Sequence, residues 1–175
     1  RVVEACNNQL GCNFLDHEKE ELKDIMLDLK GTVAGRFLWQ LGTETVDRLG
    51  LPSLQNCSFV VVDDPVRPFT WAFEMLMLGS GVGFNIQREN VYQLPKVGST
   101  KVNIERKDKN DADFIVPDSR EGWVQLLERV IESHFWQDGG SEDFTFATHL
   151  IRPKGAKIKG FGGTASGSED LVWGM

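Results

Sequence analysis

The chain has 175 residues, 41% of them hydrophobic and 26% charged, with a mean hydropathy of −0.26. It is therefore long enough for one domain, or for one domain and part of another, around an apolar core. No apolar run approaches the roughly 18 residues that span a bilayer, and no secretory leader precedes the first predicted helix. The net charge of −7 disfavours nucleic-acid binding, because neutralising phosphates requires clustered Lys and Arg.

The three cysteines are Cys6, Cys12 and Cys57, too few and too scattered for a disulfide framework or a four-ligand zinc site. Cys6 and Cys12 could be grouped with His17 as a metal cluster, but their spacing does not match that of a zinc knuckle. We therefore expect no bound metal and a cytoplasmic, reducing location.

The first predicted elements are helices. Between residues 14 and 29 apolar side chains recur at helical spacing, and Gly31 is expected to end that helix. A second, shorter helix is predicted over residues 35–41, ending at Gly42. The residues at 50–53 include glycine, proline and serine, which favour a turn before the next element.

A strand, a helix, a glycine turn and a second strand then follow in order. The strand is predicted at residues 57–62, and its lack of strict alternation indicates burial on both faces. Residues 69–78 form an apolar helix, and Gly79 to Ile86 read as a tight turn leading into the second strand. This order is that of a parallel βαβ unit, so we expect an α/β fold.

The next segment contains the most clearly patterned helix of the chain. An edge strand is predicted over 101–107 and an exposed charged loop over 107–113. Asp118 or Ser119 is expected to cap a helix whose apolar face runs through residues 123–135.

The C-terminal part is predicted to return to extended and loop structure. Gly139 and Gly140 are expected to end the preceding helix, residues 144–151 to form a strand, and residues 160–167 to form a glycine-rich loop. Aromatic side chains follow the predicted helix and strand faces throughout, so we expect them in the core.

Cys57 is the first candidate for chemistry, because α/β proteins bind ligands at strand ends and a thiol there can serve redox chemistry. A single cysteine in a core can equally be a small apolar side chain. The glycine turn at 79–83 is the second candidate, since consecutive backbone amides can hold an anion. It precedes a strand instead of opening a helix, so it is neither a Walker loop nor a dinucleotide fingerprint, and it can also serve only to reverse the chain.

The histidines carry weaker signals. His134 lies on the apolar helix face and is interpreted as a core histidine, and His17 lies on an acidic helix and is interpreted as solvated. His149 lies in a strand pattern near Arg152, which would allow a phosphate contact, but nothing else in the sequence supports one. No paired carboxylates and no Ser-His-Asp arrangement stand out.

Five collinear runs carry a family resemblance. They are GRFLW with GT at 35–43, LQNCSFV at 54–60, PF through GSGVGF at 68–84, PDSREGWV at 117–124, and IRPKGA through GFGGTASG at 151–167. Together they resemble the N-terminal portion of monomeric adenosylcobalamin-dependent (class II) ribonucleotide reductases. The resemblance implies an N-terminal helical region at 1–50, followed at 51–175 by the first strands and helices of an incomplete ten-stranded α/β barrel that includes effector-region elements.

The resemblance also implies a reaction, the reduction of a ribonucleotide to a deoxyribonucleotide by radical chemistry. Adenosylcobalamin supplies a 5′-deoxyadenosyl radical that generates a thiyl radical on a cysteine. Cys57 matches one of two further cysteines that reduce the substrate and close to a disulfide. Asn56, Ser58, Ser80 and Gly81 are implied to lie near the substrate phosphates.

Further partners follow from the same resemblance. They are a deoxynucleotide effector at the helix over 66–77 and the region from Gln87 onward, an external dithiol such as thioredoxin, and the remaining C-terminal barrel portion. The thiyl cysteine and the second reducing cysteine would lie beyond Met175, so we expect no activity from this chain alone. The stretch 97–117 is shorter than in long monomeric members. The alternatives are a stand-alone nucleotide-binding or regulatory module and a purely structural assembly domain.

Overall fold

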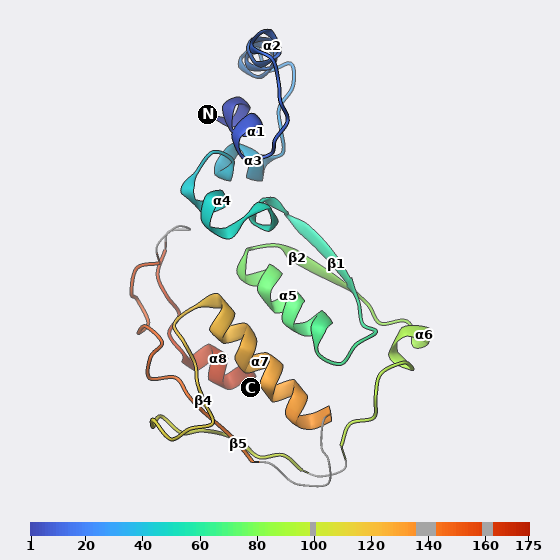
Figure 1. The fold of residues 1–175 in the computed structure, drawn as a ribbon, viewed down its shortest axis with the longest axis vertical. Coiled ribbons are helices and arrows are strands. Elements are labelled where there is room, and N and C mark those ends of the chain that lie inside the picture. The colour runs from blue at the N-terminus through green and yellow to red at the C-terminus, as the bar shows by residue number, and fades with distance from the viewer. Residues whose placement is uncertain (99–100, 136–142, 159–162) are drawn as a thin grey trace. The chain divides into compact units, whose positions relative to one another are not determined.

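The computed structural model describes residues 1–98, 101–135, 143–158 and 163–175 (Figure 1). The chain divides into two compact units. Unit 1 comprises Arg1–Cys57 and Leu78–Ser80, and unit 2 comprises Ser58–Met77 and Gly81–Met175. The predicted helix end at Gly139 and Gly140 and part of the loop predicted over 160–167 lie outside the described residues. Within the described part, none of the helices has the length and apolarity to cross a membrane.

Unit 1 is built from short helices. They are α1 (Val2–Asn8), α2 (Asp16–Leu27), α3 (Gly35–Gln40), α4 (Glu44–Leu49) and the 3₁₀ helix η1 (Leu51–Leu54). The sequence pattern predicts α2 and α3 and misses α1 and α4. Those two have only 7 and 6 residues, fewer than the window in which helical periodicity becomes visible.

The predicted end of the first long helix is wrong. It ends at Leu27 and not at Gly31, because Leu29 takes a left-handed backbone conformation with φ 56°. Leu27 is 79% exposed and Leu29 is 91% exposed, so both side chains lie largely in solvent. Leucine rarely adopts a positive φ, which is why the sequence gives no warning of this turn.

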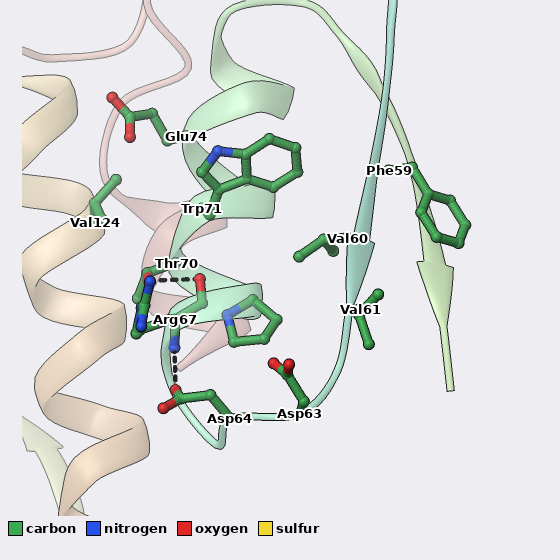
Figure 2. Close-up of a pocket in the computed structure, with 11 residues that line it drawn as sticks. Phe59, Val60, Val61, Asp63, Asp64, Arg67, Thr70, Trp71, Glu74 and Val124 are labelled. Carbon is green, nitrogen blue, oxygen red and sulfur yellow. Dashed lines mark hydrogen bonds between the residues drawn. The ribbon is translucent and has the colours of Figure 1, made fainter. Parts of the chain in front are cut away.

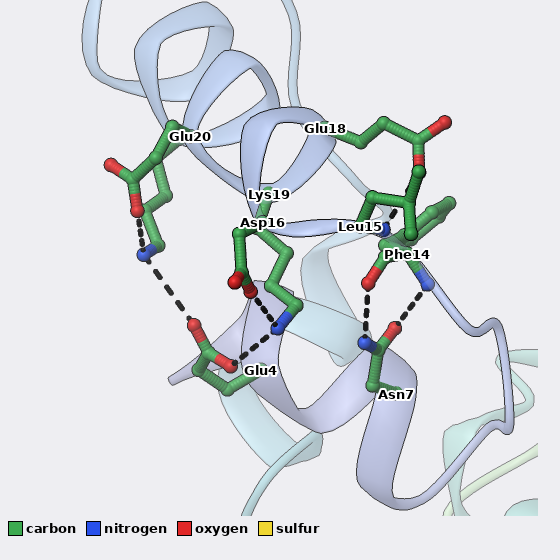
Figure 3. Close-up of polar contacts among 9 residues, drawn as sticks. Glu4, Asn7, Phe14, Leu15, Asp16, Glu18, Lys19 and Glu20 are labelled. Carbon is green, nitrogen blue, oxygen red and sulfur yellow. Dashed lines mark hydrogen bonds and ion pairs between the residues drawn. The ribbon is translucent and has the colours of Figure 1, made fainter.

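Charged and amide side chains join α2 to α1 (Figure 3). The ammonium of Lys19 lies 3.8 Å from the Glu4 carboxylate, and that of Lys23 lies 3.4 Å from it. The side chain of Asn7 accepts a hydrogen bond from the amide of Phe14 at 2.8 Å and donates one to its carbonyl at 2.9 Å. This paired contact closes the loop between the two helices.

The core of unit 1 is small. It consists of four buried side chains: Ala5, Leu41, Val46 and Leu54. Gly42 follows this core with φ 78°, and a Cβ there would lie 3.0 Å from the Cβ of Ala5. A glycine is therefore required at this position both for its backbone conformation and for the close approach of α1.

Unit 2 contains most of the extended structure. Its strands are β1 (Cys57–Val61, whose first residue belongs to unit 1), β2 (Gly81–Asn85), β3 (Ile104–Arg106), β4 (Phe114–Ile115) and β5 (Phe144–Ala147). Its helices are α5 (Arg67–Met77), α6 (Arg88–Val91), α7 (Arg120–Phe135) and α8 (Glu169–Gly174). The predicted order of strand, helix, glycine turn and strand is confirmed.

Two sheets form, and their pairing matches the expected α/β class. β1 pairs with β2, and Figure 2 shows the two strand arrows pointing the same way. The second sheet has the order β3-β5-β4, with both pairs parallel and Ile104 aligned with Phe144. Among the described strands β3 lies at an edge, as predicted for residues 101–107.

The core of unit 2 lies beneath α7, which runs alongside α5 (Figure 1). Its buried side chains are Val116, Leu126, Val130, Phe146, Ile151 and Leu171. The hydroxyl of Ser119 accepts a hydrogen bond from the amide of Gly122 at 3.0 Å, so Ser119 caps this helix as predicted.

Two predictions about burial are wrong. β1 is not buried on both faces, because Cys57 is exposed and Phe59 is 63% exposed, and Figure 2 shows Phe59 pointing away from α5. The aromatic residues are not uniformly in the core, since Trp39 is 60% exposed and Trp173 is 91% exposed. In the described chain β1 is paired only with β2, and α5 covers one face of this pair.

Candidate functional site

The segment that precedes β1 places Cys57 at the surface. Leu54 and Ser53 are buried at the end of η1, and the Ser53 hydroxyl donates to the carbonyl of Gly50 at 2.7 Å. These contacts fix the turn, after which Asn56 and Cys57 are exposed. The thiol of Cys57 is therefore solvent-exposed at the start of a strand and is not a buried apolar side chain.

The glycine turn of unit 1 is linked to this segment through Arg36. Its guanidinium donates to the carbonyls of Gln55 at 2.9 Å, Leu78 at 3.1 Å and Gly79 at 2.6 Å. Gly79 has φ 81°, and Ser80 beside it is 2% exposed. Unit 1 thus brings the backbone before Cys57 and the backbone before Ser80 to a single side chain.

Sequence reasoning missed the part played by Arg36. The available signal was a single cation within an apolar helical run, GRFLW, with no acidic residue nearby along the chain. Such a residue needs hydrogen-bond acceptors from elsewhere in the fold, because arginine carries up to five donors and no acceptor.

The two remaining predicted site residues open the paired strands of unit 2. Ser58 is half-buried at the second position of β1, and Gly81 is exposed at the first position of β2. Further along β2, a Cβ at Gly83 would lie 3.0 Å from the ring of Phe59. The small residues of β2 therefore allow the aromatic ring on β1 to lie across them.

Unit 2 has a hollow of about 500 Å³ between β1 and α5 (Figure 2). Figure 2 shows Val60 pointing from β1 toward α5. The polar and aromatic side chains that line the hollow are Asp63, Asp64, Arg67, Thr70, Trp71 and Glu74. The volume is in the range of small-molecule sites, but the carboxylates outnumber the single cation, which disfavours a phosphate ligand there.

Asp64 joins this hollow to the start of α5. Its carboxylate accepts the backbone N–H of Arg67 at 2.7 Å and that of Val66 at 2.9 Å. The hydrogen bond from the Arg67 amide is the largest effect and lowers the pKa of the Asp64 carboxyl. Burial opposes it, and the hydrogen bond from the Val66 amide adds to the lowering. Asp64 therefore serves the helix start.

The other candidate side chains, His134, His149 and Arg152, belong to unit 2. His149 is exposed in the turn after β5, and Arg152 is paired with the carboxylate of Asp118 at 2.7 Å. His134 is half-buried in the last turn of α7, and its carbonyl accepts the N–H of Gly98. None of these contacts indicates a phosphate or a catalytic base.

Cys6 and Cys12 lie close to each other in unit 1. The amide of Cys12 donates to the carbonyl of Cys6 at 3.0 Å, and His17 is exposed on α2. Burial, followed by the neighbouring Cys12, raises the pKa of the Cys6 thiol, which favours its protonated form. Among the described residues, no three or more Cys, His, Asp and Glu side chains gather as metal ligands.

Comparison with known proteins identifies the second half of the chain. Residues 85–175 match the family model of the B12-dependent ribonucleotide reductase insertion domain. This match covers more than half of the chain. The chain belongs to the B12-dependent ribonucleotide reductase family.

Individual reductases extend the likeness over almost the whole chain. The adenosylcobalamin-dependent ribonucleoside-triphosphate reductase of Lactobacillus acidophilus is 34% identical over 208 residues, covering 91% of this chain and 28% of that protein. The enzyme of the same name from Euglena gracilis is 33% identical over 174 residues, covering 94% of this chain and 22% of that protein. The chain thus spans less than a third of the length of these reductases.

A solved reductase gives the same result for the fold. A crystal structure of a B12-dependent (class II) ribonucleotide reductase superposes with a TM-score of 0.77 at 29% identity, covering 98% of this chain and 31% of that chain. The likeness to this class II reductase therefore includes elements of both units.

Proposed function

We propose that this chain is part of a ribonucleotide reductase and that Cys57 is one of the two cysteines that reduce the substrate. The observation that carries this proposal is the exposure of Cys57 at the start of β1, beside a backbone that Arg36 ties to the glycine turn. Membership of the reductase family supports substrate reduction as the role of this exposed thiol.

The proposed step balances as a two-electron reduction. The bond between C2′ of the ribose and its hydroxyl oxygen breaks, and a C2′–H bond forms. The hydroxyl oxygen leaves as water. The two electrons come from two thiols, which close to a disulfide. A thiol in this role must reach its partner cysteine and then an external dithiol such as thioredoxin, and the exposed position of Cys57 allows both.

We further propose that Asn56, Ser58, Ser80 and Gly81 lie near the substrate phosphates. Backbone amides and short polar side chains hold negative charge without a cationic patch, and this suits a chain with a net charge of −7. The exposure of Asn56 and Gly81 supports this assignment.

The remaining assignments rest on the family. We propose that residues 1–50 are an N-terminal helical region, that 51–175 begin a ten-stranded barrel, and that residues 66–77 and the region from Gln87 belong to a deoxynucleotide effector site. Adenosylcobalamin, when bound, supplies the radical that starts the reaction. We assign it to no residue of this chain, because the acidic hollow of about 500 Å³ does not suit so large a group.

The test is a chimeric reductase in which this chain replaces the aligned segment of the Lactobacillus acidophilus relative. The pre-reduced chimera is mixed with adenosylcobalamin and a ribonucleoside triphosphate without external dithiol, and deoxynucleotide is counted per active site. We expect about one product per site from the unaltered chain, because one pair of thiols supplies one reduction. The 175-residue chain alone is expected to form none.

Cys57→Ser is expected to abolish this single turnover, whereas Cys12→Ser, which removes another exposed thiol, leaves it intact. A chimera that forms product with Cys57→Ser would contradict the role of Cys57. A folded chimera that binds nucleotide but forms no product would favour a nucleotide-binding module without catalysis.

A further inference from the structure

The guanidinium of Arg36 donates hydrogen bonds to four backbone carbonyls. Nη1 donates to the carbonyl oxygens of Ser53 at 3.3 Å, Gln55 at 2.9 Å and Leu78 at 3.1 Å, and Nη2 donates to that of Gly79 at 2.6 Å. All four acceptors belong to unit 1. The side chain is therefore a backbone clamp and not the partner of a single carboxylate.

The clamp joins two segments that are far apart along the chain. Gln55 lies 19 residues from Arg36, and Gly79 lies 43 residues from it. The first segment runs directly into Asn56 and Cys57, and the second runs directly into Ser80. Holding both segments with one rigid planar group fixes their mutual placement, which separate contacts to solvent-exposed loops would not do.

The glycine turn is shaped to receive the guanidinium. A Cβ at Gly79 would lie 3.4 Å from Nη2 and 3.7 Å from Nη1 of Arg36, at a backbone φ of 81°. A side chain there would be strained by the backbone, and its Cβ would be in van der Waals contact with the guanidinium. Gly79 and Arg36 are thus matched to each other in space, although their positions in the sequence do not suggest a relationship.

We propose that Arg36 is a positioning residue for the reductase site, setting the placement of the Cys57 backbone against that of the Ser80 turn. This inference rests on the proposed function, since it assigns Cys57 to the reducing thiol and Ser80 to the phosphate side. Arg36 contacts no reacting atom. It acts by holding thiol and phosphate site at a fixed spacing, on which reaction rates depend steeply.

Arg36→Gln and Arg36→Lys in the chimeric reductase test this role. We expect Arg36→Gln to lower the single-turnover rate by about 100-fold, the size of effect that a displacement of about 1 Å produces, and to raise KM for the ribonucleoside triphosphate. Arg36→Lys retains a charge and three donors and is expected to recover part of the loss. Arg48→Gln removes an exposed arginine of α4 that lies outside the proposed substrate and effector regions, and it is expected to change neither quantity.

Hydrogen exchange provides a readout that does not depend on activity. In the 175-residue chain, Arg36→Gln is expected to speed exchange in peptides covering 53–58 and 77–82 and to leave α7 unchanged. Unchanged exchange in both peptides would overturn the clamp. A second outcome is a lower active fraction with wild-type KM and wild-type rate per active site. It would mean that Arg36 only supports folding, and this also overturns the proposal.

The two proposals fail in distinguishable ways. If the unaltered chimera is inactive, the proposed function fails, and the positioning role falls with it even if exchange changes. If the unaltered chimera is active and both Arg36 variants match it in rate and KM, only the positioning role is overturned.

Discussion

The two units of this chain achieve order by different physical means. Unit 2 buries large apolar side chains under α7, among them Leu126 at 0% exposure and Phe146 at 2%. Unit 1 has four small or medium side chains in its core and relies on polar side chains that bind backbone, such as Asn7 and Arg36. The comparison indicates that unit 2 is held by burial, whereas the backbone around Cys57 is held by directional contacts.

The largest effect is expected from removing burial in unit 2. Leu126→Ala deletes a fully buried side chain and should lower the free energy of unfolding by about 2–5 kcal/mol, measured by urea denaturation. Leu76→Ala, on a side chain that is 53% exposed, is the control and should cost under about 1 kcal/mol. Equal costs for the two variants would contradict the importance of the core under α7.

Leu41→Ala is the counterpart in unit 1, where Leu41 is also 0% exposed. Its effect should appear as faster hydrogen exchange in α1, α3 and α4. Exchange that instead rises first in α7 would break the distinction between the two units.

A smaller effect is expected at Gly122 in the first turn of α7. A Cβ there would lie 2.7 Å from both the Cδ and the carbonyl oxygen of Pro117, so Gly122→Ala should cost about 1–3 kcal/mol through overpacking. This would outweigh the roughly 1 kcal/mol by which alanine favours a helix over glycine. Gly174→Ala, with no neighbouring atom within 4 Å, is the control. Thermal denaturation that shows a stabilised Gly122→Ala would contradict the close packing.

The smallest effect is expected at Asp64, where unit 2 uses a polar contact of the kind common in unit 1. Asp64→Ala removes the acceptor at the start of α5 and should cost about 0.5–2 kcal/mol. The pKa of Asp64 is lower in the folded state, so its contribution is complete above the unfolded carboxyl pKa of about 3.9 and is lost as pH falls through the folded value.

Asp64→Asn keeps an acceptor oxygen but does not titrate. The difference in urea midpoint between the wild type and Asp64→Asn should therefore shrink as pH falls from 7 toward 3. Asp63→Asn, at an exposed neighbouring carboxylate, serves as the control. A difference that is constant over this range would contradict the lowered pKa of Asp64.

The sequence predicts those features that depend on neighbouring residues. The α7 helix, its cap at Ser119 and the glycine turn at Gly79 follow from local periodicity and from backbone preference. The left-handed Leu29 runs against such preferences and was therefore missed.

The features that were not predicted depend on contacts between distant segments. The exposure of β1 depends on how many strands pair with it, and the clamp at Arg36 depends on carbonyls up to 43 residues away. A pattern of side chains along the sequence records neither. Cys57 was predicted as a site residue from its place at a strand end and from the family motif, and its exposure became clear only from the fold.

The position of β5 has a consequence for how the protein is made. β5 lies in the middle of its sheet, yet its partners β3 and β4 leave the ribosome first, since Ile104 pairs with Phe144 and Phe114 pairs with Phe146. Until β5 emerges, neither strand has its hydrogen-bonding neighbour in this sheet, whereas α7 can form from local contacts as soon as it is synthesised. Pairing of these three described strands during translation therefore waits for residue Ala147, the last residue of the central one.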